Sequence, residues 1–308
     1  MIYKKIYLDK TDENVYLEAY IADKVGGFVR NAILVIPGGG YLKICSEREG
    51  EPIAMAFMPY GYNAFVLHYS AGKKSFPAHL IEASLAIKHI RDNAKEYGIN
   101  PEKVFAVGFS AGGHLAASLG TMWDRSEIYD SVDMPYGYNK PSGTMLVYPV
   151  ISAQYHKISF DNLFVGEKVS DEKLKECSIE NCVSENSSPA YIVHTSNDEI
   201  VDVRNSLALA NALAEKQIKF EMHIYPDAPH GSALGNEITK CGVEKWCNPS
   251  ISKWIENAVA WANSLKKTVT VIADFGHLCM MNSLCEFISD INSCGICDIS
   301  LRMRYITS

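Results

Sequence analysis

Short runs of hydrophobic residues recur along the chain, each closed by turn residues. Residues 32–36, Ala-Ile-Leu-Val-Ile, form one such run, which ends at Pro37 and three glycines. An unbroken apolar run of this length is typical of a strand buried on both faces, whereas residues 15–21 alternate as strands commonly do. Similar runs predict further strands of one mostly parallel sheet at residues 64–68, 104–107, 145–148, 190–193 and 220–224.

Helical periodicity fills the intervals between these strands. Residues 78–97 place Leu80, Ala83 and Ile87 at steps of three and four, so that one apolar stripe faces the sheet. Alternating strands and helices predict an α/β fold, with a mostly parallel central sheet and helices on both of its faces. The other predicted helices are residues 112–122, 203–216 and 251–266.

Two stretches interrupt the alternation, near residues 124–143 and 155–189. Both are longer than a typical connection, so we expect them to project over the ends of the strands and shape a pocket. Plain surface insertions are the alternative. The pattern predicts one domain over residues 1–267 and a C-terminal extension over residues 268–308.

The predicted extension is rich in cysteine. It offers only one C-x-x-C pair, Cys294 and Cys297, where a zinc ribbon has two. Apolar cysteines in a terminal appendage are therefore the favoured interpretation, and no metal site is predicted. The weaker metal interpretation would add Cys279, Cys285 and His277.

Composition narrows the classes of function. The 308 residues are 47% hydrophobic, enough for a large core, and their net charge of −7 disfavours nucleic acids and anionic membranes as partners. No run approaches the roughly 18 apolar residues of a membrane span, and Met1 is not followed by a signal-like apolar segment. We expect a soluble, cytoplasmic chain whose nine cysteines are mostly reduced; a homo-oligomer is left open.

A candidate nucleophile follows the predicted strand 104–107. The sequence Gly-Phe-Ser-Ala-Gly at residues 108–112 stands between that strand and a helix of small residues. A G-x-S-x-G element in this position is typical of a nucleophile elbow, because the tight turn excludes large side chains and holds the serine hydroxyl clear of the sheet. Ser110 is therefore the predicted nucleophile.

A serine hydroxyl needs a base, and the base needs an orienting carboxylate. Asp198 and His230 each lie just beyond a predicted strand, where an α/β sheet presents its functional loops. Asp198 falls first in its turn, although Glu199 and Asp202 remain open as the acid. The other histidines considered lie in or at the ends of predicted elements, where packing or hydrogen bonding is the favoured role: His68, His114, His194 and His223.

The glycine turn after residue 36 suits a developing oxyanion. Backbone N–H groups free of neighbouring Cβ atoms can point at such a charge, so Gly39, Gly40 and Ala111 are the predicted donors. A phosphate cradle is disfavoured because neither a Walker sequence nor a G-x-G-x-x-G element is present. Tyr41 is a predicted substrate-binding residue in the pocket wall.

With these motifs in place, residues 33–266 resemble the acetyl-esterase branch of the α/β-hydrolases. They are similar to the BD-FAE-like enzymes, which include acetyl xylan and feruloyl esterase-like proteins, and to hormone-sensitive-lipase-like enzymes. The residues that carry the resemblance are 37–41, 108–114, 194–201 and 230–231.

The resemblance implies an α/β-hydrolase fold and a triad of Ser110, Asp198 and His230. It also implies small acyl esters, often acetylated sugars, as substrates. We therefore expect a serine carboxylesterase that acts on short-chain acyl esters through an acyl-enzyme and needs no metal or organic cofactor. Two alternatives stay open: an amide or formamide hydrolase with the same triad, and a non-catalytic ligand-binding protein.

Overall fold

The computed structural model describes residues 1–9, 12–130, 132–265, 267–273 and 297–303. It divides into two units, residues 1–258 and 259–308. In the second unit, β9 (Lys267–Ala273) and β10 (Cys297–Met303) pair in parallel. The predicted extension over residues 268–308 stays a prediction. The metal interpretation lies outside the described residues, because it needs His277, Cys279, Cys285 and Cys294.

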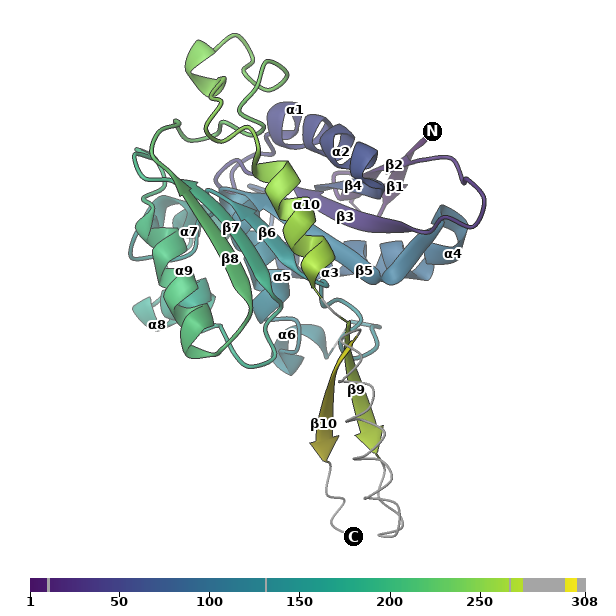
Figure 1. The fold of residues 1–308 in the computed structure, drawn as a ribbon. Helices are drawn as coiled ribbons and strands as arrows, with labels where there is room; N and C mark the ends of the chain where they lie inside the picture. Colours follow the sequence, from purple (N-terminus) through teal and green to yellow (C-terminus); the bar gives the residue numbers. More distant parts are fainter. Residues whose placement is uncertain (10–11, 131, 266, 274–296, 304–308) are drawn as a thin grey trace. The chain divides into compact units, whose positions relative to one another are not determined.

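An eight-stranded sheet forms the framework of the first unit (Figure 1). In chain order its strands are β1 (Ile2–Tyr7), β2 (Tyr16–Ile21), β3 (Arg30–Ile36), β4 (Tyr62–His68), β5 (Ile99–Phe109), β6 (Thr144–Val147), β7 (Ala190–Thr195) and β8 (Phe220–Tyr225). Their order across the sheet is β1-β2-β4-β3-β5-β6-β7-β8. β2 runs antiparallel to β1 and β4, and every neighbouring pair from β4 to β8 is parallel.

The seven predicted strands are all present, and the predicted mostly parallel sheet is confirmed. The central strands are unbroken apolar runs because helices cover both of their faces; β4, for example, is buried at every position but its last. β1 is an additional edge strand that the pattern did not predict. Its residues are exposed or half-buried, so no apolar run marks it.

Helices cover the two faces of the sheet. α2 and the start of α10 lie on one face, where the rings of Phe57 and Trp254 meet at 6.1 Å; α3, α5 and α9 lie on the other (Figure 1). The predicted helix over residues 78–97 is two helices, which meet at Asn93. The helices are α1 (Ser46–Glu49), α2 (Glu51–Phe57), α3 (Ala78–Asp92), α4 (Ala94–Tyr97), α5 (Ala111–Thr121), α6 (Ser126–Tyr129), α7 (Lys157–Leu163), α8 (Asp171–Cys177), α9 (Arg204–Glu215) and α10 (Trp254–Ser264), with 3₁₀ turns at Met58–Tyr60, Ile179–Asn181 and Glu244–Trp246.

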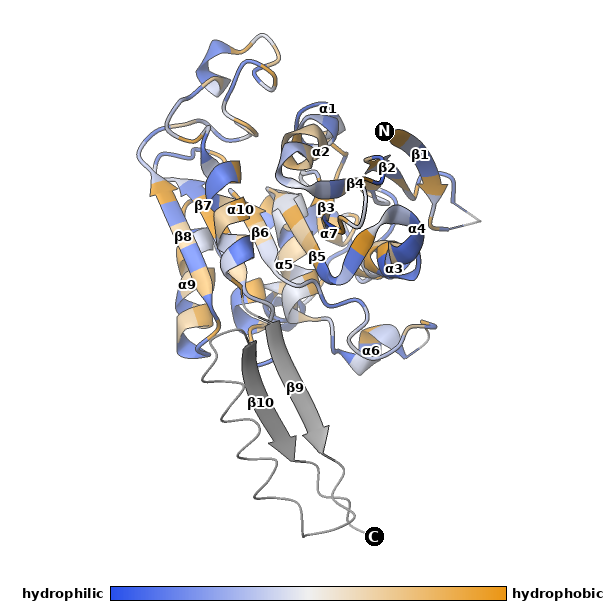
Figure 2. Ribbon diagram, turned by 45° about the vertical axis from the view of Figure 1, so that its right-hand side comes forward, coloured by the Kyte–Doolittle hydropathy of each residue, from blue (hydrophilic) through white to orange (hydrophobic). Residues whose placement is uncertain are grey.

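Hydrophobic residues concentrate in the central strands and on the helix faces turned toward them (Figure 2). The parallel strands all present their carboxyl ends at one edge of the sheet. The loops that follow β3, β5, β7 and β8 carry Gly39, Ser110, Asp198 and His230 in turn. The topology therefore gathers residues that are up to 191 positions apart at one site.

Candidate active site

Ser110 stands on a sharp turn between β5 and α5. Its backbone has φ of 52° and ψ of −119°, a region that non-glycine residues seldom adopt. The flanking glycines make the turn sterically feasible. A Cβ at Gly108 would collide with the carbonyl oxygen of Gly112, and one at Gly112 would collide with the carbonyl oxygens of Ile36 and Pro37. The predicted elbow thus has a local steric basis.

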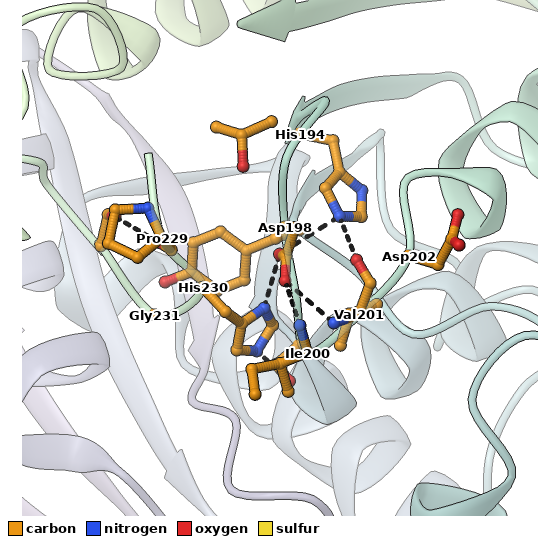
Figure 3. Close-up of polar contacts among 12 residues, drawn as sticks. His194, Asp198, Ile200, Val201, Asp202, Pro229, His230 and Gly231 are labelled. Atoms are coloured by element: carbon orange, nitrogen blue, oxygen red, sulfur yellow. Dashed lines mark hydrogen bonds and ion pairs between the residues drawn. The ribbon is translucent and has the colours of Figure 1, made fainter. Parts of the chain in front are cut away.

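His230 joins the serine to a carboxylate. Its Nε2 lies 3.0 Å from Ser110 Oγ. Its Nδ1 lies 2.7 Å from Asp198 Oδ2 (Figure 3). A carboxylate accepts the Nδ1–H, which leaves Nε2 free to accept the proton of the serine hydroxyl. The structure therefore brings together the three residues that the sequence predicted as a triad, in an arrangement capable of nucleophilic catalysis.

The carboxylate of Asp198 is held by its own loop. Oδ1 accepts the N–H groups of Ile200 and Val201, each at 2.9 Å, while Oδ2 faces His230 and lies 3.4 Å from His194 Nε2 (Figure 3). Burial by itself would raise the pKa of Asp198. The hydrogen bonds from His194, His230 and the backbone outweigh burial and hold that pKa below its usual range.

The two rival carboxylates lie elsewhere. Glu199 is exposed, and Asp202 pairs with Arg204 at 2.6 Å. In Figure 3 the side chain of Asp202 lies apart from His230, whereas Asp198 lies between His230 and His194. Of the three acids that the sequence left open, Asp198 is the one whose carboxylate contacts His230.

His194 lies beside the Asp198 carboxylate, on the side away from His230 (Figure 3). This buried histidine donates its Nε2–H to the carbonyl oxygen of Val201 at 2.8 Å, so its Nδ1 accepts the hydroxyl of Ser206 at 2.7 Å. The expectation of a hydrogen-bonding rather than basic role agrees with these contacts. Apart from the spacing of four residues, nothing in the sequence indicated that His194 lies close to Asp198.

The glycine turn presents free N–H groups. Among the described residues, no protein group accepts a hydrogen bond from the N–H of Gly39, Gly40 or Ala111. Gly39 has φ of +128°, and a Cβ there would collide with the carbonyl oxygen of Lys43, so only glycine fits the turn. The N–H of Gly38, by contrast, is taken by Glu49 Oε2 at 2.8 Å.

Glu49 is a buried carboxylate that the sequence did not single out. Its side chain is 3% exposed, and its second oxygen accepts the hydroxyl of Tyr148 at 2.9 Å. That hydroxyl in turn accepts the N–H of Ala233 at 3.0 Å, and the Tyr148 ring packs on the His230 ring at 4.8 Å between centroids. Burial raises the pKa of Glu49, although the hydrogen bonds from Gly38 and Tyr148 oppose that rise.

Tyr41 does not reach the pocket. Its side chain is 1% exposed, and its hydroxyl bonds to His114 Nδ1 at 2.8 Å. His114 Nε2 faces the carbonyl oxygen of Cys177, and burial lowers the pKa of His114 to about 4. In place of the predicted substrate contact, Tyr41 packs beneath the glycine turn as part of the core, and His114 is a buried hydrogen-bonding residue.

A pocket opens in front of Ser110. One wall comes from Arg48, whose guanidinium donates to the carbonyl oxygen of Gly231 at 2.6 Å and lies 3.9 Å above the Trp246 ring. His156 and Ser159, from the predicted insertion over residues 155–189, line another part of the pocket. The other predicted insertion does not reach this pocket among the described residues: ten of its residues between Asp124 and Asn139 line a separate hollow with Trp123. The residues that line the pocket are Gly39, Gly40, Cys45, Arg48, Glu49, Ser110, His156, Ser159, Ile200, His230, Gly231 and Trp246.

Two models of known protein families match the chain. Residues 17–213 match the model of the BD-FAE family, and residues 166–271 match that of the dienelactone hydrolase family. The chain belongs to the BD-FAE family. The predicted resemblance and the predicted α/β-hydrolase fold are therefore confirmed.

Two curated relatives of this BD-FAE family member are bacterial. Endo-1,4-beta-xylanase B of Butyrivibrio fibrisolvens is 39% identical over 68% of the chain, and the acetylxylan esterase of Xylanibacter ruminicola is 31% identical over 75%. The chain spans 33% of the length of the first and 47% of the second.

Solved structures include a more complete match. The acetyl ester-xyloside bifunctional hydrolase of Caldicellulosiruptor lactoaceticus is 32% identical, with a TM-score of 0.73 over 85% of this chain and 96% of its own. The carboxylesterase Cest-2923 of Lactobacillus plantarum is 25% identical, with a TM-score of 0.75 over 85% of this chain and 97% of its own.

Within the described part of the BD-FAE family chain, no helix is long and apolar enough to cross a membrane. The same residues contain no group of three or more His, Cys, Asp or Glu side chains that could hold a metal ion.

Proposed function

We propose that this chain is a serine carboxylesterase that hydrolyses short-chain acyl esters, with acetyl esters of sugars as its substrates. One observation carries the proposal. The hydrogen-bonded series Asp198–His230–Ser110 ends in a pocket that is also lined by Gly39 and Gly40, whose backbone N–H groups have no acceptor among the described residues. A nucleophile, a base, an orienting acid and oxyanion donors are the parts that acyl transfer requires.

Acylation begins with attack by Ser110 Oγ on the ester carbonyl carbon. His230 Nε2 takes the hydroxyl proton as the Oγ–C bond forms, and Asp198 stabilises the resulting imidazolium. The carbonyl oxygen becomes an oxyanion, which accepts hydrogen bonds from the N–H groups of Gly39, Gly40 and Ala111; each donor is worth about 3 kcal/mol of barrier. His230 then gives its proton to the departing alkoxide, which leaves as the alcohol.

Deacylation repeats these steps with water. His230 takes a proton from the water as its oxygen attacks the acyl carbon, and the same N–H groups stabilise the second oxyanion. The Ser110 Oγ–C bond then breaks, and the serine recovers its proton from His230. One ester and one water thus give one carboxylic acid and one alcohol.

The lining of the pocket supports a short acyl group and a polar alcohol. Among the described residues, Ile200 and Trp246 are the only large apolar side chains that line it, which is too few to enclose a long acyl chain. Arg48, His156 and Ser159 supply polar atoms instead. The names of the relatives, an acetylxylan esterase and an acetyl ester-xyloside hydrolase, point to acetylated sugars as well.

Substitution of the nucleophile tests the proposal. We expect Ser110→Ala to lower kcat for p-nitrophenyl acetate by about 10⁵-fold while the fold is retained. Purified proteins should be assayed on p-nitrophenyl esters from acetate to octanoate and on acetylated xylose, with circular dichroism as a check of folding. The matched control is Ser118→Ala on α5, the helix that follows Ser110; the Ser118 hydroxyl donates to the carbonyl oxygen of His114.

Two outcomes would contradict the proposal. Equal rates for wild type and Ser110→Ala would exclude the serine mechanism. Faster turnover of p-nitroacetanilide than of the acetate ester would move the assignment to an amide hydrolase. A decline in kcat/KM from acetate to octanoate is the expected result for a short acyl site.

A further inference from the structure

Ser159 is a buried residue in the wall of the active-site pocket, and its hydroxyl has no protein partner. Its side chain is 1% exposed and lines the same pocket as Ser110 and His230. Among the described residues, nothing accepts from or donates to its Oγ. A buried hydroxyl without a hydrogen bond is unfavourable, so a persistent one in a pocket points to a ligand that supplies the bond.

Neighbouring polar groups in the pocket are already engaged. Both oxygens of Glu49 accept hydrogen bonds, both ring nitrogens of His230 belong to the triad, and Trp246 Nε1 donates to the carbonyl oxygen of His230 at 3.1 Å. Arg48 donates to Gly231. The Ser159 hydroxyl differs from these groups because the fold makes no use of it.

Ser159 also lies next to the oxyanion turn. It is on α7, three residues before Asn162, whose Nδ2 donates to the carbonyl oxygen of Gly40 at 2.8 Å. Since residues three apart share one face of a helix, the face of α7 that contacts the glycine turn also carries Ser159. A substrate whose carbonyl oxygen faces Gly40 therefore has Ser159 within the same small pocket.

The chemistry of an acetyl ester limits what can bond to this hydroxyl. The carbonyl oxygen is directed to the N–H groups of the oxyanion turn, and the acetyl methyl group can neither donate nor accept a hydrogen bond. The partner must therefore belong to the alcohol portion. A second hydroxyl beside the acylated oxygen is the group that a sugar or polyol supplies there.

We propose that Ser159 is a specificity-determining residue that hydrogen bonds a free hydroxyl of the alcohol portion, adjacent to the ester oxygen. The substrates are then partially acylated sugars or polyols rather than simple alkyl esters. This inference rests on the proposed esterase function and adds the residue that would select its substrates. A site that bonds a substrate hydroxyl discriminates strongly against the analogue that lacks it.

Two matched esters test the subsite: 1-monoacetylglycerol, which has a hydroxyl beside the ester, and propyl acetate, which has the same carbon skeleton without hydroxyls. Acid release by wild type and Ser159→Ala should be followed in a pH-stat. We expect wild type to favour monoacetylglycerol in kcat/KM, and Ser159→Ala to reduce that preference at least tenfold. The Tm of Ser159→Ala should not fall, because the fold loses no hydrogen bond.

Tyr62→Phe is the control, since it removes another buried hydroxyl at a residue outside the pocket lining. It should leave the preference between the two esters unchanged. An unchanged preference in Ser159→Ala, or a loss of activity on both esters accompanied by a lower Tm, would overturn the subsite while leaving the esterase in place. A wild type that hydrolyses neither ester would overturn the esterase proposal, and the subsite with it.

Discussion

Two buried carboxylates of the site, Asp198 and Glu49, differ in charge preference. Asp198 accepts two backbone N–H groups at one oxygen and faces two imidazoles with the other, so its pKa lies below the usual range. Glu49 accepts one N–H group and one hydroxyl, and burial raises its pKa. Both residues are buried, and burial raises the pKa of each carboxyl group. Asp198, which faces two imidazoles as well as two N–H groups, is the one whose donors outweigh burial.

The origins of those donors differ as well. Asp198 is held largely by residues within four positions of it, so one loop builds most of its site. Glu49 instead connects separate parts of the chain: the glycine turn after β3, Tyr148 after β6 and, through Tyr148, Ala233. We infer that Asp198 tunes the base, whereas Glu49 fixes the oxyanion turn relative to the loop that carries His230.

Of the substitutions that compare the two carboxylates, Asp198→Asn has the largest expected effect. The asparagine oxygen can still accept the two N–H groups, but its amide donates toward His230 Nδ1 and favours the wrong tautomer. We expect kcat for p-nitrophenyl acetate to fall about 10⁴-fold in a folded protein. Steady-state kinetics and circular dichroism provide the measurement.

Asp202→Asn is the matched control, four positions away and paired with Arg204. Its kcat should stay within twofold of wild type. If Asp202→Asn were the slower enzyme, or if Asp198→Asn lost less than tenfold, Asp198 would not be the acid, and the contrast with Glu49 would lose its basis.

Prediction from sequence succeeds here where the signal is local. The strand before Ser110, the two glycines around it and the loop positions of Asp198 and His230 are all encoded within a few residues. The topology of the sheet then brings these loops together, because its parallel strands end at the same edge. The fold class and the three residues brought together at the site were therefore accessible.

Contacts between distant residues had no such signal. Glu49 meets Tyr148 across 99 positions, and neither residue stands in a recognisable motif. Tyr41 illustrates the opposite error: it follows the glycine turn directly, but its side chain packs into the core beside His114. The direction in which a side chain points depends on packing, and a position next to a motif does not determine it.

Glu49→Gln probes the second carboxylate. Glutamine keeps the shape, but one oxygen becomes an amide that donates, so either Gly38 or Tyr148 loses its acceptor. We expect kcat to fall about 10²-fold with KM changed little, because a displaced oxyanion turn weakens the transition state more than the ground state. Initial rates over a range of p-nitrophenyl acetate concentrations separate the two constants.

Glu47→Gln, an exposed neighbour on α1, serves as the control and should behave as wild type. A rise in KM with unchanged kcat in Glu49→Gln would place Glu49 in ground-state binding. A fall as large as that of Asp198→Asn would remove the distinction between an acid that tunes the base and one that positions the turn.

The smallest expected effect concerns stability, and the two carboxylates should give opposite signs. The folded-state pKa of Asp198 lies below the ordinary value of 3.8, so its contribution to stability is present above pH 3.8 and is lost as the pH falls. The folded-state pKa of Glu49 lies above the ordinary value of 4.5, so its contribution is present below pH 4.5 and is lost as the pH rises through the folded-state value.

Urea unfolding of wild type, Asp198→Asn and Glu49→Gln between pH 3 and 8 measures both signs. The free energy of unfolding of wild type relative to Asp198→Asn should increase by about 1 kcal/mol as the pH rises from 3 to 5. Relative to Glu49→Gln it should decrease as the pH rises above 4.5. Slopes of the same sign would mean that burial alone governs both groups, because only the different sets of donors predict that the two slopes diverge.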